Sequence, residues 1–136
     1  MANSIQEIAA VSNLPLQEQN LDLLPAEGRI AKRKVRGADG HYFIKIGSLN
    51  DLTLLMSEKI GLEALAVAGA IKVPKVIFVG ETLTCSFLIC EYLDLKKDNL
   101  FSGKILGKQL ALLHQNSNEF FGLSEDNWIG LNPQKN

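Results

Sequence analysis

The stretch Gly37-Ala-Asp-Gly-His-Tyr-Phe-Ile-Lys-Ile46 decides the fold of this 136-residue chain. Its first four residues are typical of a tight turn, and the next six are rich in aromatic and β-branched side chains. Residues 29–36, before the turn, have strand character as well. The stretch therefore predicts a β-hairpin, and residues 21–24 extend it to a three-stranded antiparallel meander.

A long helix is predicted directly after this meander. Asn50-Asp51 is a helix cap, and apolar residues then recur at helical spacing from Leu52 to Val67. Gly69 is placed to end the helix. Gly61 lies in its interior, where glycine costs about 1 kcal/mol relative to alanine. We therefore expect tight packing around Gly61.

Two further strands, at 73–79 and 86–92, bring the predicted sheet to five antiparallel strands. Ser4 and Glu7 have the spacing of a capping box and predict a short N-terminal helix that starts at Ser4. Residues 17–22 are polar and show no periodicity, so they predict a loop.

Composition excludes several classes of protein. With 46% apolar and 21% charged residues and a net charge of −1, the chain is typical of a globular domain and not of a protein that binds nucleic acid or anionic membranes. We expect no leader segment at the N-terminus and a cytoplasmic location. Cys85 and Cys90 are five residues apart, so they lie on opposite faces of one strand. This predicts two buried free thiols and no disulfide.

Lys45 and Glu58 are the first candidates for chemistry. A strand lysine followed by a helix glutamate is the arrangement by which kinases hold the α- and β-phosphates of ATP. Taken singly, each has a plainer interpretation: Lys45 as a solvent-facing strand residue, and Glu58 on a solvated helix face near Lys59 and Glu63. Glu63 is a second candidate for the carboxylate.

A basic run spans residues 29–36, with five cations in eight positions. It fits a phosphate-facing strand or a nucleic-acid patch, but Lys32, Lys34 and Arg36 alternate as on the solvated face of an edge strand, and we favour that interpretation. His114 falls in the last turn of a helix predicted over residues 104–115, where it suits the helix dipole. No residues have the spacing of a metal site.

The end of the chain carries a family resemblance. The residues that carry it are Leu106-Gly-Lys-Gln-Leu-Ala-Leu-Leu-His114, Phe121-Gly-Leu123, Asp126-Asn-Trp-Ile-Gly130, Pro133-Gln134 and Asn136, together with Tyr42–Lys45, Glu58–Leu65, Val73-Pro74 and Phe87–Leu93 upstream. In this order and spacing they resemble the fructosamine (ketosamine) 3-kinase family, relatives of aminoglycoside and choline kinases.

The resemblance implies an α+β fold: a protein-kinase-like N-terminal lobe with a five-stranded antiparallel sheet, one long packed helix, and a second helix leading toward an absent C-terminal lobe. Residues 1–93 would form the ATP-binding lobe. Residues 94–136 would be the helix after the hinge and the truncated start of the C-terminal lobe.

The resemblance also implies a chemistry. Family members use ATP and Mg²⁺ to phosphorylate the carbon-3 hydroxyl of ketosamines on protein lysines, and the product decomposes, which deglycates the protein. The cofactor-binding residues would be Lys45, Glu58, Glu91, Tyr92 and Leu93. Glu58 fits the family pattern better than Glu63. Without the resemblance, residues 91–93 are only the end of a strand.

Two parts of the family pattern differ or are absent. Residues 25–31, where relatives carry a glycine-rich turn over the phosphates, hold a single glycine and include Glu27, which would repel phosphate. The His-Gly-Asp catalytic loop of relatives is absent from the sequence, so no catalytic residue or metal ligand is assigned.

We therefore expect this chain alone to be inactive. The partners implied for the complete enzyme are a glycated protein or a small ketosamine. For this chain, the expected partner is the missing C-terminal lobe or a second copy, contacted through Phe120, Phe121 and Trp128. The alternative is a non-catalytic nucleotide-binding or regulatory module. A generic α+β interaction domain is a third, weaker reading.

Overall fold

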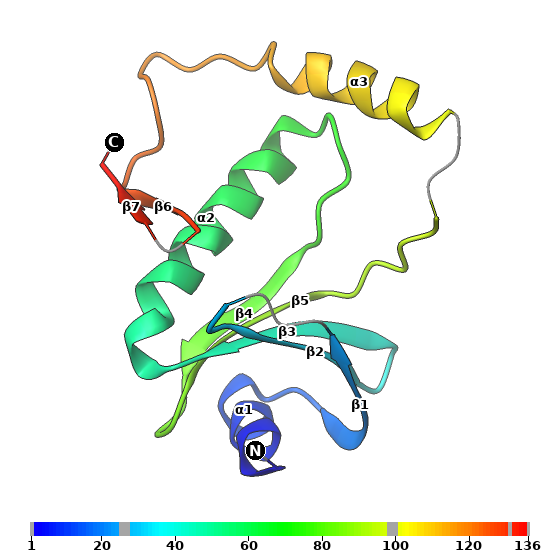
Figure 1. Ribbon diagram of the computed structural model, residues 1–136, viewed down its shortest axis with the longest axis vertical. Coiled ribbons are helices and arrows are strands. Elements are labelled where there is room, and N and C mark those ends of the chain that lie inside the picture. The colour runs from blue at the N-terminus through cyan, green and yellow to red at the C-terminus, as the bar shows by residue number, and fades with distance from the viewer. Residues whose placement is uncertain (1, 25–27, 98–100, 131, 136) are drawn as a thin grey trace.

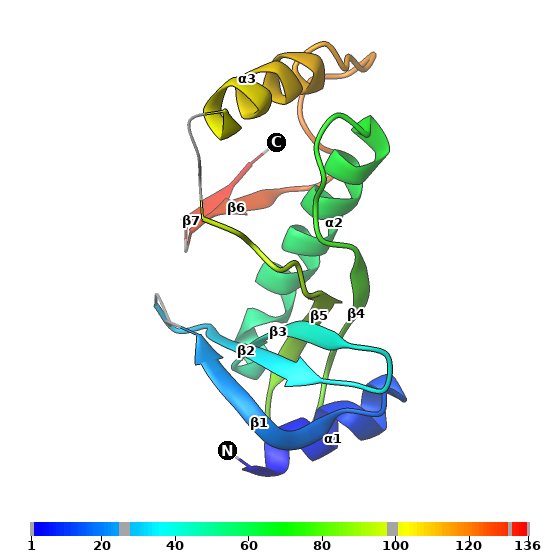
Figure 2. The same ribbon diagram turned by 90° about the vertical axis from the view of Figure 1, so that its right-hand side faces the viewer.

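The computed structural model describes residues 2–24, 28–97, 101–130 and 132–135. A twisted sheet lies between two helices, and a third helix stands apart from it (Figures 1 and 2). The elements are α1 (Ala2–Ser12), β1 (Gln17–Leu24), β2 (Ala31–Arg36), β3 (His41–Gly47), the 3₁₀ turn η1 (Leu49–Asp51), α2 (Leu52–Ala68), β4 (Val76–Glu81), β5 (Ser86–Glu91), α3 (Ser102–Leu113), β6 (Asn127–Ile129) and β7 (Asn132–Gln134).

The main sheet has five antiparallel strands, the number predicted, and their order is β1-β2-β3-β5-β4. The turn at residues 37–40 closes the predicted hairpin, with the Gly37 N–H donating to the Gly40 carbonyl over 2.7 Å. It places Arg36 opposite His41 and so fixes the register of β2 on β3. A second sheet, β6 paired with β7, was not predicted. The described residues therefore hold seven strands, two more than the sequence indicated.

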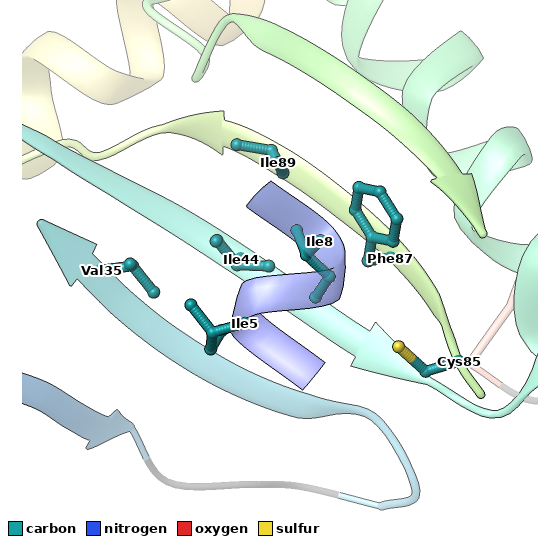
Figure 3. Close-up of a cluster of buried hydrophobic side chains, with 7 residues drawn as sticks. All are labelled: Ile5, Ile8, Val35, Ile44, Cys85, Phe87 and Ile89. Atoms are coloured by element: carbon teal, nitrogen blue, oxygen red, sulfur yellow. The ribbon is translucent and has the colours of Figure 1, made fainter. Parts of the chain in front are cut away.

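One face of the sheet is covered by α1 (Figure 3). Ile5 and Ile8 are buried against a cluster from three strands and the turn before β5, made of Val35, Ile44, Cys85, Phe87 and Ile89. Full burial of one such aliphatic side chain contributes about 1.5–3 kcal/mol. The helix begins at Ala2, so Ser4 lies inside it and the prediction of Ser4 as the cap was wrong. Packing of the apolar stripe, more than the cap, sets where this helix forms.

The opposite face is covered by α2. Leu55 is buried with Leu88 and Cys90 in a second cluster. Both cysteines are free and buried, Cys85 in the α1 cluster and Cys90 in the α2 cluster, which confirms the predicted burial on opposite faces, although Cys85 lies just before β5 and not on it. Gly69 ends α2 in a left-handed conformation with φ of 64°, also as predicted.

Two expectations about local structure were wrong. Residues 17–22 are not a loop but belong to β1, which pairs with β2 in a register that shifts between Gln17 and Asp22. The unpaired backbone of β2 offers hydrogen bonds to any neighbouring extended segment, so this strand needs no alternation of its side chains. Gly61 is not tightly packed either, because the space where its Cβ would stand is open.

The third helix, α3, buries none of its side chains. It lies apart from the sheet, and the chain then returns along α2 to the β6–β7 hairpin (Figure 1). His114 is the residue at its C-cap, in agreement with the position predicted for it. No helix in the described part of the chain has both the length and the apolar character that a bilayer crossing requires.

Candidate functional site

Lys45 and Glu58 meet in the structure. The Nζ atom of Lys45 donates to Oε1 of Glu58 over 2.5 Å, and the two side chains are 22% and 32% exposed. Alternation along β3 turns Lys45 to the face that α2 covers. Glu58 follows the buried Leu55 by three residues and so lies on the same stripe of the helix. Glu63, the other candidate, is exposed and pairs with Lys59 at 3.3 Å.

This ion pair joins β3 to α2 and holds the lysine amine against the carboxylate of Glu58. Its field reaches Cys90, whose pKa is raised to about 11. Burial is the main cause, the negative charge of Glu58 adds to it, and the positive charge of Lys45 partly offsets it. The pair therefore stands beside a dry thiol, where charges are less screened than at an open surface.

A cavity of about 550 Å³ lies above the pair. Its wall comes from five places: the turn before β2, strand β2, strand β3, one side of α2, and the tail, by which we mean residues 123–130. The lining residues are Gly28, Arg29, Ile30, Lys32, Lys45, Leu54, Leu55, Ser57, Glu58, Gly61, Leu62, Leu65, Leu123, Asn127, Trp128 and Gly130. The cations gather on the sheet side and the leucines on the helix side, so the cavity has a cationic end and an apolar end.

Strand β2 supplies one of these cations. It is an interior strand paired on both sides, so the interpretation of Lys32, Lys34 and Arg36 as the face of an edge strand was wrong. Lys32 lies directly opposite Lys45 in the ladder and, half-buried, lines the same cavity. The backbone of β1 covers the edge that the sequence seemed to leave free.

An ion pair fixes the turn that precedes β2. Arg29 Nε lies 2.5 Å from Oδ1 of Asp51, whose side chain is 1% exposed. The N–H and the hydroxyl of Ser48 donate to Oδ2 of Asp51 over 2.8 and 2.7 Å. Burial alone would raise the pKa of this carboxyl, but these hydrogen bonds and Arg29 hold that pKa below its ordinary value. Asp51 thus ties the turn to the start of α2, which carries Glu58.

The expected capping role of Asn50-Asp51 needs a correction. Asp51 occupies the N-cap position of α2, but its side chain makes no hydrogen bond to the first turn of that helix. The carboxylate is turned back to Ser48 and Arg29 instead. A buried carboxylate takes the strongest donors within reach, and a guanidinium is a stronger partner than a helix N–H.

The turn before β2 contains the one glycine of the predicted phosphate-covering stretch. Gly28 has φ of +80°, a conformation that glycine adopts without strain. Glu27, which we expected to repel phosphate, lies outside the described residues, as do Pro25 and Ala26.

The expected adenine-binding residues line a second cavity, of about 490 Å³. Glu91, Tyr92 and Leu93 lie there with Phe43, Lys72, Pro74 and Leu95. The two cavities have no lining residue in common, but Phe43 and Lys45 lie two residues apart on the same face of β3. The structure therefore brings Lys45 and Glu58 together and places residues 91–93 beside a neighbouring, mostly apolar slot.

Two of these three residues are engaged by other groups. The Glu91 N–H donates to the carbonyl of Lys75 over 2.8 Å, and the Glu91 carboxylate lies 3.7 Å from Lys72. The Nζ atom of Lys34 lies 4.4 Å from the centre of the Tyr92 ring, within cation–π range. These contacts hold the end of β5 in place at the mouth of the slot.

Sequence reasoning missed the contribution of the tail. Asn127 and Trp128 of β6 line the cavity above Lys45, whereas the sequence pattern indicated an interface for Trp128. Gly130, with φ of +62°, makes the bend between β6 and β7. A glycine between two short runs with strand character is a hairpin signal that the sequence contained.

The cavity suits the phosphates of a nucleotide better than it suits a metal held by protein alone. Three cations and one carboxylate line it among the described residues. Within those residues there is also no cluster of three or more His, Cys, Asp or Glu side chains that could hold a metal ion. Mg²⁺ usually arrives on the phosphates with only one or two carboxylates from the protein.

The chain resembles known proteins along most of its length. The family model of fructosamine kinase matches residues 4–136. A probable ketoamine kinase of Klebsiella aerogenes is 35% identical over 93% of this chain and 47% of its own length. One from Synechocystis is 36% identical over 70% of this chain and 32% of its own. The chain thus spans about half the length of the curated relatives it matches, or less.

Solved structures show the same fold. A crystal structure from Haemophilus somnus, assigned as a fructosamine-3-kinase, superposes with a TM-score of 0.82 and 25% identity over 97% of this chain and 45% of its own. One from Thermobifida fusca, at 22% identity, gives a TM-score of 0.78 over the whole of this chain. With residues 4–136 matched by the family model, the chain belongs to the fructosamine kinase family.

Proposed function

We propose that these residues form the nucleotide-binding lobe of a ketosamine kinase and bind Mg²⁺-ATP. The observation that carries the proposal is the 2.5 Å contact between Lys45 and Glu58 at the cationic end of a cavity. An ion-paired lysine presents its amine in one direction, which is what recognition of the α- and β-phosphates requires. Adenine would lie in the apolar slot beside Glu91, Tyr92 and Leu93.

In the complete protein we propose transfer of the γ-phosphate of ATP to the carbon-3 hydroxyl of fructosamine or ribulosamine on proteins, or of a small ketosamine. Mg²⁺ would neutralise charge on the phosphates. Phosphoryl transfer also needs a group that orients the attacking hydroxyl. The His-Gly-Asp loop that would supply it does not occur in this sequence. We therefore propose that the 136 residues alone bind nucleotide without transferring phosphate.

We also propose a division at residue 93, with residues 94–136 as the beginning of a C-terminal lobe, and a cytoplasmic location.

A specific observation favours a role in association as well. Phe120 and Phe121 are 78% and 105% exposed, and α3 shows apolar side chains to solvent. Such a surface would contact either the rest of a kinase or a second copy of this chain. The second outcome would suit a non-catalytic regulatory module.

The test is thermal unfolding with and without Mg²⁺-ATP, on wild type, Lys45→Ala and the control Lys59→Ala. Lys59 carries the same charge on α2 but pairs with the exposed Glu63. Ligand at about 100 times its Kd stabilises a protein by about 2.7 kcal/mol. We expect wild type and Lys59→Ala to be stabilised alike and Lys45→Ala much less. Equal stabilisation of all three would contradict the role of Lys45, and no stabilisation of wild type would contradict nucleotide binding.

A further inference from the structure

We propose that Lys32 is a second phosphate-binding cation, which replaces contacts that the glycine-poor turn cannot supply. The inference rests on the proposed nucleotide site and adds a residue to it. It starts from the ladder between β2 and β3, where Lys32 and Lys45 are direct partners. Residues directly opposite each other in an antiparallel pair project to the same face with their Cβ atoms about 5 Å apart.

Two lysines in this relation repel each other, and like charges directly opposite destabilise a sheet. Glu58 neutralises Lys45 at 2.5 Å. Among the described residues, the structure shows no carboxylate paired with Lys32, although this side chain is half-buried and faces the cavity. An anion bound between the two amines would attract both of them and so offset their mutual repulsion.

The charges of the neighbouring residues single out Lys32. The lining holds three cations, and Arg29 is engaged by the buried carboxylate of Asp51. Lys45 is engaged by Glu58. The uncompensated charge of the described lining is therefore that of Lys32, which attracts an anion into the cavity.

The turn explains why an extra cation is useful. Between Leu24 of β1 and Ala31 of β2 there is one glycine, Gly28. Phosphates are commonly held by backbone N–H groups that glycines leave uncovered. With fewer of these, a side-chain cation on the strand can supply the attraction. Because Lys32 faces the phosphate end, its effect should increase with the number of phosphates on the ligand.

The experiment compares Lys32→Met with Arg36→Met by calorimetric titration. Methionine keeps the apolar stem and removes the charge, and Arg36 is on the same face of the same strand, four residues away and exposed. The probes are inorganic tripolyphosphate, Mg²⁺-ATP, Mg²⁺-ADP and AMP. We expect Lys32→Met to weaken tripolyphosphate and Mg²⁺-ATP about tenfold, as loss of one charged hydrogen bond predicts, to weaken Mg²⁺-ADP less, and to leave AMP within about twofold.

Unfolding without ligand gives a second readout. Because Lys32→Met removes the repulsion from Lys45, the variant should be as stable as the wild type or more so; a purely structural lysine would instead show reduced stability with unchanged affinities. Reduced stability of Lys32→Met with unchanged affinities would therefore overturn the proposal. Equal losses of affinity in Lys32→Met and Arg36→Met would overturn it as well. Wild-type binding of tripolyphosphate but not of Mg²⁺-ATP, with the loss confined to Lys32→Met, would support the anion site and contradict the nucleotide assignment. If the wild type binds neither tripolyphosphate nor Mg²⁺-ATP, both the role of Lys32 and the nucleotide site are contradicted.

Discussion

The part of the chain up to residue 97 and the part from residue 101 differ in where their apolar side chains lie. The first part buries them in two clusters, one on each face of the five-stranded sheet. In the second part, α3 buries none, and Leu106, Leu112 and Phe121 are exposed. The first part therefore has a core of its own, whereas α3 adds no buried side chain to that core.

This difference also separates two roles. The first part supplies the cationic end of the cavity through Lys32 and Lys45. Among its described residues, the second part touches the cavity through its last segment, with Leu123, Asn127, Trp128 and Gly130. The tail thus closes a site that the first part has built, and α3 makes no contribution to the lining.

The largest expected effect tests whether stability resides in the first part. Phe87 is fully buried and stacks on Phe78 with ring centres 5.7 Å apart. Phe87→Ala should lower the free energy of unfolding by about 3–5 kcal/mol. Leu110→Ala on α3, where Leu110 is 42% exposed, should change it by less than about 0.5 kcal/mol. Urea unfolding followed by circular dichroism measures both. Similar losses would show that α3 belongs to the same core.

A second effect tests how dry the α2 face of the first part is. The pKa of Cys90 is about 11 in the folded chain against an ordinary 9.0. Below pH 9 the thiol is protonated in both states, and from pH 9 to 11 the unfolded chain loses the proton first. The free energy of unfolding should therefore fall over this window by about 2–3 kcal/mol on account of Cys90.

The measurement is the stability of wild type, Cys90→Ala and Leu88→Ala between pH 8 and 11. Cys90→Ala lacks the thiol, so its deficit relative to wild type should shrink as the pH rises. Leu88 is buried in the same cluster and cannot ionise, so the deficit of Leu88→Ala should stay constant. A constant deficit for Cys90→Ala would mean that water reaches the thiol.

The smallest effect on stability, and a clear one on assembly, is expected in the second part. The wild type should self-associate as its concentration rises, and the double variant Phe120→Ser/Phe121→Ser should do so less, with its stability changed by less than about 0.5 kcal/mol. Leu83→Ser is the control, because Leu83 is 94% exposed but lies in the first part. Sedimentation velocity over a range of concentrations measures all three. A wild type that stays monomeric at high concentration would contradict the role of the aromatic pair.

Local patterns in the sequence predicted much of the first part. The turn at residues 37–40 fixes β2 on β3, the apolar spacing gives α2, and the odd spacing of Cys85 and Cys90 gives their opposite faces. The meeting of Lys45 with Glu58 followed from the order of a strand lysine and a helix glutamate. Each of these depends on residues close in sequence or on one strand-to-helix contact.

What the sequence did not indicate depends on partners distant in the chain. Residues 17–22 carry no alternation and become β1 because β2 offers its backbone. That pairing also makes β2 an interior strand, so Lys32 is not a residue of a solvated edge strand but lines the cavity. The same register that sets Arg36 opposite His41 sets Lys32 opposite Lys45, so this contact was within reach of the sequence. The packing of the tail beside α2 could not be predicted from the sequence. Two short strands joined at one glycine indicate a hairpin, but they do not indicate which surface the hairpin packs against.

The most direct test of the nucleotide site is a titration of the ¹⁵N-labelled chain with Mg²⁺-ATP, followed by the shifts of its backbone amide signals. We expect the largest shifts at Gly28, at Lys45 and Glu58, and at residues 91–93, with the amides of α3 unchanged. Shifts confined to α3 and the segment around Phe120, or no shifts at millimolar Mg²⁺-ATP, would contradict the nucleotide site.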